Sequence, residues 1–193
     1  MQNQRRVIID YVSPKVNNGD FYIKRIVNEI VKVNAHVLVD GHDVISASVL
    51  YKHDTAKNWN EVRMDLLGND EWQASFSVKK QGFYSYKVQG WVDYALNWQH
   101  GIQRKIEDGQ HVKSELLEGI PFITDTIKKV TGNDIPYLEH LQHIFGDEHQ
   151  YEEAIKEATS ERLHHIFTMY PQKILANTSK EYQVYVDRKK SAI

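Results

Sequence analysis

Cysteine is missing from this sequence of 193 residues, which excludes disulfide bonds, thiolate metal sites and a cysteine nucleophile. The sequence also lacks a large excess of positive or negative residues. The 24 lysines and arginines nearly balance the 26 aspartates and glutamates, so the net charge of −2 gives no field that would attract nucleic acid or anionic lipid. Long apolar runs are also missing, since the amino-terminal MQNQRRVIIDYVSP has only VII as an apolar core. We therefore expect a cytoplasmic protein that binds neither nucleic acid nor membrane.

Alternation of apolar and polar residues is the main pattern from residue 5 to about 93. The stretch IVKVNAHVLVD (30–40) places valine or alanine at every second position from 31 to 39. The turn residues DGHD follow, and then VISASVLYK resumes the alternation. This pattern predicts strands with one buried face, joined by turns.

The aromatic residues of GNDEWQASFSVKKQGFYSYKVQGWVD (68–93) follow the same alternation. Trp72 and Phe76 share one face of the first predicted strand, and Tyr84 and Tyr86 share one face of the second. Two neighbouring strands with matched apolar faces need a second sheet to cover them, so most of these aromatics are predicted to lie in a sandwich core. Phe83 and Trp91 fall on the otherwise polar face and are available for other contacts.

A helical periodicity replaces the alternation after Asp93. Four apolar stripes between 94 and 172, joined by short turns, predict a four-helix bundle, and Pro121 is expected to interrupt the second stripe. EYQVYVD (181–187) then returns to a strand pattern, and a lone strand needs a sheet to join. The predicted fold is therefore mixed but mainly β: a β-sandwich formed by 1–93 and 174–193, with a helical bundle (94–173) inserted before its last strand.

No catalytic or metal-binding pattern is visible. The ten histidines include the pairs His140 with His143 and His164 with His165, but zinc needs three or four converging ligands and no HExxH motif is present. Phosphate-binding, dinucleotide-binding and nucleophile-elbow motifs are absent, and most acidic residues lie on polar helix faces. We predict no catalytic residue, no metal and no cofactor.

Several segments together resemble the amino-terminal region of bacterial maltose-1-phosphate maltosyltransferases, which are glycoside hydrolase family 13 enzymes related to α-amylases. DGHD, GNDxW, GxYxYxVxGWVD and WxHG occur here in the same order and spacing. The resemblance covers about 1–120 and the final strand, and little of 121–175.

The resemblance implies a cytoplasmic enzyme that extends α-1,4-glucan with maltosyl units from maltose 1-phosphate, with retention of configuration. Catalysis in that family uses an aspartate nucleophile and a glutamate acid/base in a (β/α)₈ barrel, which this chain lacks. The region that it resembles is an immunoglobulin-like sandwich with an inserted helical bundle, and both parts help to form a homodimer. We therefore expect an excised domain that ends about where the barrel would begin.

Two functions remain open from the sequence. The first is a non-catalytic assembly domain that dimerises and joins the catalytic barrel of its full-length chain. The alternative is an α-glucan-binding module, which would need solvent-facing aromatics to stack on sugar rings. Phe83, Trp91 and Trp98 are the candidate binding residues, and their other interpretation is a ledge for the helical insert or a partner subunit. A free-standing enzyme is the least favoured interpretation.

Overall fold

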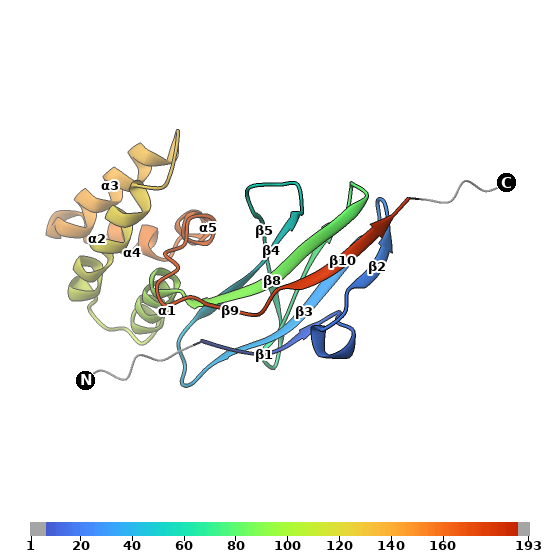
Figure 1. Ribbon diagram of the computed structural model, residues 1–193. Helices are drawn as coiled ribbons and strands as arrows, with labels where there is room; N and C mark the ends of the chain where they lie inside the picture. The colour runs from blue at the N-terminus through green and yellow to red at the C-terminus, as the bar shows by residue number, and fades with distance from the viewer. Residues whose placement is uncertain (1–6, 189–193) are drawn as a thin grey trace. The chain divides into compact units, whose positions relative to one another are not determined.

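The computed structural model describes residues 7–188 (Figure 1). Contacts divide the chain into two compact units. The first unit consists of Met1–Val92 with Leu175–Ile193 and holds the strands, and the second, Asp93–Ile174, holds the α-helices. Each unit is described by itself below.

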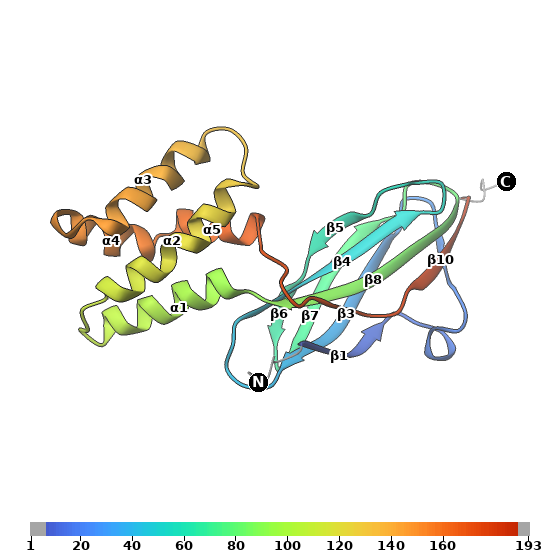
Figure 2. The same ribbon diagram turned by 60° about the vertical axis from the view of Figure 1, so that its left-hand side comes forward.

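The first unit contains two sheets (Figure 2). The four-stranded sheet has the order β1 (Val7–Ser13), β3 (Ile30–Val39), β7 (Glu71–Ser77) and β6 (Asp65–Gly68). The six-stranded sheet has the order β2 (Ile23–Ile26), β10 (Tyr182–Asp187), β8 (Gly82–Val92), β4 (Ile45–His53) and β5 (Asn60–Arg63), and the short β9 (Asn177–Thr178) pairs with β8. Neighbouring described strands are antiparallel except for β10 and β2, which run parallel.

One apolar core joins the inner faces of the two sheets. The predicted inward residues Trp72, Phe76, Tyr84 and Tyr86 are all buried, which confirms the alternation of β7 and β8. Phe76 stacks on Tyr51, with ring centroids 4.3 Å apart and an interplanar angle of 13°. Offset stacking of this kind adds to the free energy that burial alone provides.

The second unit contains α1 (Tyr94–Glu107), α2 (Lys113–Ile127), α3 (Asp134–Gly146), α4 (Tyr151–Ala158) and α5 (Glu161–Met169). Asp93 begins α1, because its carboxylate accepts a hydrogen bond from the Leu96 amide at 3.1 Å. The predicted apolar stripes form the inside of this unit, and Leu138, Leu141 and Ile144 are fully buried. The helix α2 continues past Pro121, so the expected interruption there was wrong.

Two further expectations need correction. Strands and helices cover about equal parts of the described chain, so the fold is mixed and not mainly β. Turns and loops take up much of 7–92, whereas most of the inserted segment is helical. The described part of the insert holds five α-helices where four were predicted. Ser160 separates α4 from α5: its backbone is extended, and its hydroxyl accepts a hydrogen bond from the Leu163 amide at 3.2 Å.

Candidate binding face of the six-stranded sheet

The outer face of the six-stranded sheet carries a cluster of three aromatic rings. The strands β8 and β10 are neighbours in this sheet (Figure 1). Phe83 on β8 lies directly across from Tyr185 on β10, and their ring centroids are 5.0 Å apart. Tyr22, just before β2, places its ring 5.3 Å from Phe83 and 6.1 Å from Tyr185. Tyr84 and Val184 alternate with Phe83 and Tyr185 along the strands and are buried, so the aromatic cluster faces away from the core. Tyr22 remains 42% exposed.

A hollow of about 240 Å³ adjoins this cluster. Its lining residues come from the turn before β2 and from the start of β10 with the residue before it: Gly19, Asp20, Phe21, Tyr22, Glu181 and Gln183. Asn17 and Asn18 have positive φ, as does Gly19 at +88°. A Cβ at Gly19 would lie 2.7 Å from Cε1 of the Tyr182 ring, so the turn leaves little room for a side chain there. The turn that lines the hollow therefore lies against the start of β10.

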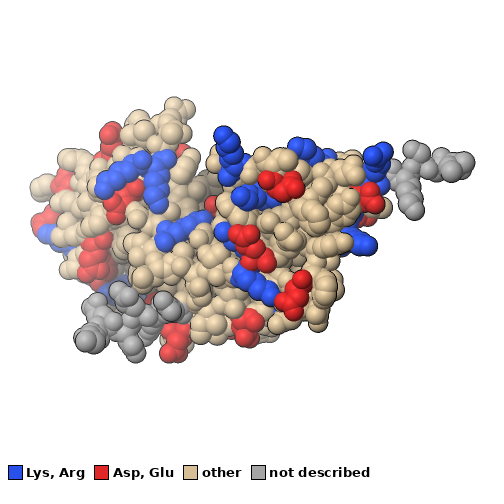
Figure 3. Space-filling view, viewed as in Figure 1, with Lys and Arg blue, Asp and Glu red and all other residues tan. Residues whose placement is uncertain are grey.

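The charges around the hollow are paired. Asp20 lies 3.8 Å from the Lys180 ammonium, and Glu181 lies 3.7 Å from that of Lys87. The Lys87 ammonium also lies 4.1 Å from the ring centroid of Trp59, which connects the hollow to a fourth aromatic side chain on this face. Lysine, arginine and acidic side chains are interspersed over the surface that Figure 3 shows, with uncharged stretches between them. The face is therefore aromatic and polar, without a strong field of either sign.

The three residues proposed from the sequence lie in different surroundings. Phe83 belongs to the aromatic cluster and is partly exposed. Trp91 is fully buried, with the Arg63 guanidinium 4.9 Å from its ring centroid. Trp91 is therefore not one of the solvent-facing aromatics that the glucan-binding interpretation needs.

Trp98 is a core residue of the helical unit, so it is also not a solvent-facing aromatic of the kind that the glucan-binding interpretation needs. Its indole N–H donates to the Glu115 carbonyl at 2.7 Å, and its ring centroid is 5.9 Å from that of Phe145. Gly119 on α2 lies against its ring. The indole thus joins α1 to α2 and α3, where a sugar cannot reach it.

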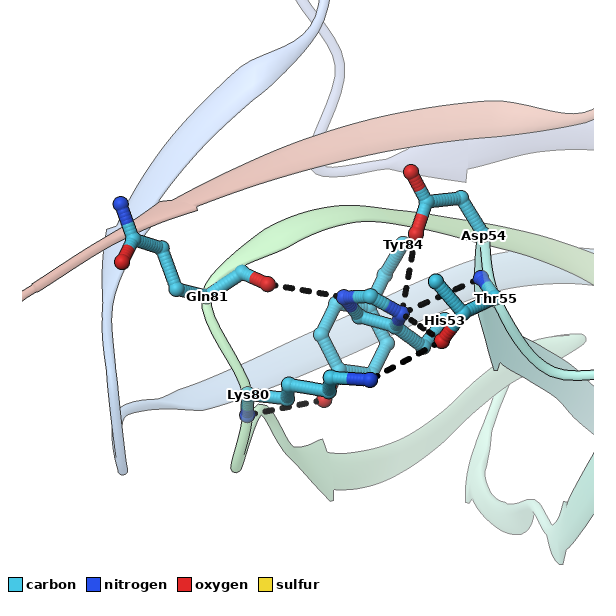
Figure 4. A network of polar contacts seen from close by, with 6 residues as sticks. All are labelled: His53, Asp54, Thr55, Lys80, Gln81 and Tyr84. Carbon is cyan, nitrogen blue, oxygen red and sulfur yellow. Dashed lines mark hydrogen bonds and ion pairs between the residues drawn. The ribbon is translucent and has the colours of Figure 1, made fainter.

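A network of polar contacts surrounds His53 at the end of β4 (Figure 4). Nε2 lies 2.8 Å from the Gln81 carbonyl oxygen, which only accepts, so Nε2 carries a proton. Nδ1 lies 2.9 Å from the Asp54 carboxylate and 2.8 Å from the Thr55 hydroxyl. A catalytic triad needs the hydroxyl and the carboxylate on opposite ring nitrogens. Here both contact the same nitrogen, so the network joins the end of β4 to the turn before β8 and does not activate Thr55.

The remaining histidines do not form a metal site in the described chain. His140 Nε2 pairs with Glu153 at 2.9 Å, and His164 Nδ1 lies 3.1 Å from the Gln99 side-chain oxygen. Between residues 7 and 188, no three His, Asp or Glu side chains converge as metal ligands would. None of the described helices is long and apolar enough to cross a bilayer.

A larger hollow of about 500 Å³ lies within the helical unit. Buried Leu116 and Phe145 form part of its lining, and the rings of His111 and Tyr151 stack beside it with centroids 4.5 Å apart. Tyr151 is held in place because its hydroxyl accepts a hydrogen bond from the Val112 amide at 3.0 Å.

Comparison with known proteins shows the family. Residues 5–188 match the family described as alpha-1,4-glucan:maltose-1-phosphate maltosyltransferase, domain N/S. The chain belongs to this family. It is 34% identical to the maltosyltransferase of Chlorobaculum tepidum over 97% of this chain and 28% of that protein. The protein of the same description from Salinibacter ruber is 30% identical over 94% of this chain and 27% of that protein. The one from Methylacidiphilum infernorum is 37% identical over 62% of this chain and 18% of that protein.

The chain spans about a quarter of the length of the Chlorobaculum tepidum and Salinibacter ruber maltosyltransferases. The family match runs through both units, so the helical insert belongs to the domain as much as the sandwich does.

Sequence reasoning missed three residues of the candidate face in this domain of the maltosyltransferase family. Tyr22 and Tyr185 complete the cluster with Phe83, and Trp59 contacts Lys87. A signal for Tyr185 was present, because it alternates with Tyr182, Val184 and Val186 on the last strand. Tyr22 had no comparable signal, since the turn before β2 has no regular period.

Proposed function

We propose that this chain is the non-catalytic assembly domain of a maltosyltransferase that extends α-1,4-glucan from maltose 1-phosphate. The family match and the names of the relatives support the activity of the full-length enzyme. The proposal places catalysis in a (β/α)₈ barrel of the same full-length chain, in the cytoplasm. It also treats the two-sheet unit as an immunoglobulin-like sandwich, for which the mostly antiparallel pairing and the shared core are the support.

An exposed apolar edge is the observation that carries the assembly role. Leu66 and Leu67 are consecutive residues of β6, the last strand of the four-stranded sheet, with 56% and 55% of their surface exposed. Edge strands usually carry charges or are covered, because an apolar edge invites pairing with another chain. Two leucines on such an edge fit a surface that a second subunit covers in the assembled enzyme.

A twofold homodimer is the simplest assembly for such an edge. In a twofold interface the same patch of both subunits meets itself, so β6 of one subunit would lie beside β6 of the other. Each β6 backbone could then pair with a strand of the other subunit, and the leucines would leave water. Leu117 on α2 and Met169 on α5 are exposed by 45% and 56%, so the helical unit also has apolar surface for a partner.

Light scattering on the 193-residue chain tests this role. We expect a dimer for the unaltered chain, and a monomer for the double variant Leu66→Glu with Leu67→Glu, because two like charges would face their copies across the twofold axis. Ile30→Glu is the matched control, since Ile30 on β3 is 63% exposed but lies outside β6. A monomeric unaltered chain, or equal dissociation by both variants, would contradict the proposal. Circular dichroism of each variant would check that it is folded.

A further inference from the structure

We propose that the outer face of the six-stranded sheet binds a stretch of α-1,4-glucan, with Tyr22, Phe83 and Tyr185 as its stacking residues. The hollow beside Tyr22 would take one sugar ring. The choice of an α-glucan rests on the proposed function, whereas the position of the site rests on the side chains described above. This surface is separate from the β6 edge assigned to assembly.

The aromatic cluster lies at the surface of the sheet and not in the core. Phe83 and Tyr185 sit across from each other on adjacent strands, and Tyr22 meets Phe83 edge to face at 84°. An edge-to-face contact fixes the Tyr22 ring without covering both of its faces, and Tyr22 remains 42% exposed. The C–H faces of a hexose can pack on such a ring, while the hydroxyl groups at the sugar's edge need polar partners.

The polar partners lie in the hollow. Asp20 and Glu181 supply carboxylate oxygens, and the exposed Gln183 amide can both donate and accept hydrogen bonds. The lysine partners of the two carboxylates stand 3.8 and 3.7 Å away, beyond normal hydrogen-bond length, so the oxygens keep lone pairs for hydroxyl donors. At about 240 Å³ the hollow is below the roughly 300–1,000 Å³ of pockets for drug-sized ligands, which suits a single sugar ring.

The paired charges around the hollow favour an uncharged ligand. Each acidic group of the hollow has a lysine beside it, so the face attracts neither a polyanion nor a strongly basic segment. A neutral, hydroxyl-rich chain fits this mixture of rings and paired charges better than a nucleic acid would.

Trp59 extends the proposed binding surface beyond the hollow. The Lys87 ammonium contacts the Trp59 ring at 4.1 Å and Glu181 at 3.7 Å, so aromatic surface lies on both sides of the Lys87–Glu181 pair. A linear glucan that occupies the hollow can therefore also contact the Trp59 ring. The chain has four tryptophans, and Trp72, Trp91 and Trp98 are buried. A change in tryptophan fluorescence on binding would thus report mainly on Trp59.

Calorimetric and fluorescence titration of the 193-residue chain with maltoheptaose tests the site. We expect saturable binding with a change in fluorescence, and Tyr22→Ala or Tyr185→Ala should weaken it by about tenfold or more, as for other central aromatic anchors. Tyr11→Ala is the matched control, because Tyr11 on β1 is 43% exposed and lies in the other sheet. Its affinity should equal that of the unaltered chain.

The outcomes separate this inference from the assembly proposal. Light scattering should give the same mass for Tyr22→Ala as for the unaltered chain, and the β6 double variant should keep its affinity for maltoheptaose. A dimer that shows no saturable binding would overturn the inference alone. Equal effects of Tyr22→Ala and Tyr11→Ala would overturn it as well. Binding that is lost in His111→Ala but kept in Tyr22→Ala would place the sugar in the helical unit and overturn it too.

Discussion

Replacing Gly119 with alanine should destabilise the helical unit, although alanine is the better helix former. Gly119 is buried in the middle of α2 and faces the Trp98 indole. A Cβ built there would lie 2.7 Å from Cε2 and 2.8 Å from Cη2 of that ring. Carbon atoms pack best at about 3.5–4.0 Å, so the indole would have to retreat by about 1 Å.

The structure sets the size of this effect through opposing contributions. Overpacking a filled core destabilises by about 1–3 kcal/mol. Retreat of the indole also weakens the 2.7 Å hydrogen bond from Trp98 Nε1 to the Glu115 carbonyl, which contributes about 0.5–1.5 kcal/mol. The higher helix propensity of alanine offsets about 1 kcal/mol of this destabilisation, because alanine loses less backbone freedom on folding than glycine does. The net expectation is a loss of about 1–3 kcal/mol in the free energy of unfolding.

Urea unfolding followed by far-ultraviolet circular dichroism measures this loss. Gly101→Ala is the matched control, since Gly101 lies inside α1 and a Cβ there meets nothing within 4 Å. That variant should gain about 0.5–1 kcal/mol. With Trp98→Phe already present, the smaller ring leaves space, so adding Gly119→Ala should be neutral or stabilising. A Gly119→Ala protein as stable as the unaltered chain would refute the packing argument.

Further predictions concern a buried aromatic and a tyrosine that titrates late. Phe76→Ala should lower the free energy of unfolding by about 3–5 kcal/mol in urea titrations, because Phe76 is 4% exposed and stacks on Tyr51; a loss below about 1 kcal/mol would contradict its place in the core. Burial raises the pKa of Tyr137 to about 12 from 10.0, so the folded state binds more protons than the unfolded state between these pH values. The free energy of unfolding should therefore fall as pH rises from 10 towards 12, and the fall should be shallower in Tyr137→Phe. If the free energy of unfolding of the variant and of the unaltered chain fell equally steeply with pH, the raised pKa of Tyr137 would be contradicted.

The strand faces could be predicted from the sequence because a period of two reports directly which side of a strand is buried. This is why Trp72 and Phe76 were correctly placed in the core. The same pattern correctly put Trp91 on the face opposite Tyr84 and Tyr86, but alternation carries no information on what lies over that face. Arg63, from a strand nearly thirty residues earlier, lies over the indole.

The features that could not be predicted from the sequence depend on contacts between residues far apart in the chain. The aromatic cluster depends on the registers of β10 with both β2 and β8, and no local pattern specifies which strands become neighbours. Trp98 meets rings from α2, α3 and α5, so its burial depends equally on how the helices pack. The boundary between α4 and α5 could have been predicted from the sequence, because a serine followed by glutamate and an apolar residue at 160–163 is a typical helix start.

The position of β10 has a consequence for how the chain folds during synthesis. Within the described chain β2 pairs only with β10, yet about 160 residues separate them, and β10 also pairs with β8. While the ribosome is still producing the insert, β2 has no partner strand, and the edge of β8 that later pairs with β9 and β10 is unpaired. The helices are built from local contacts and can form early, whereas the six-stranded sheet must wait for the last strand. We therefore expect a nascent chain that stops before residue 182 to be sensitive to proteases in the sandwich while its helices are already protected.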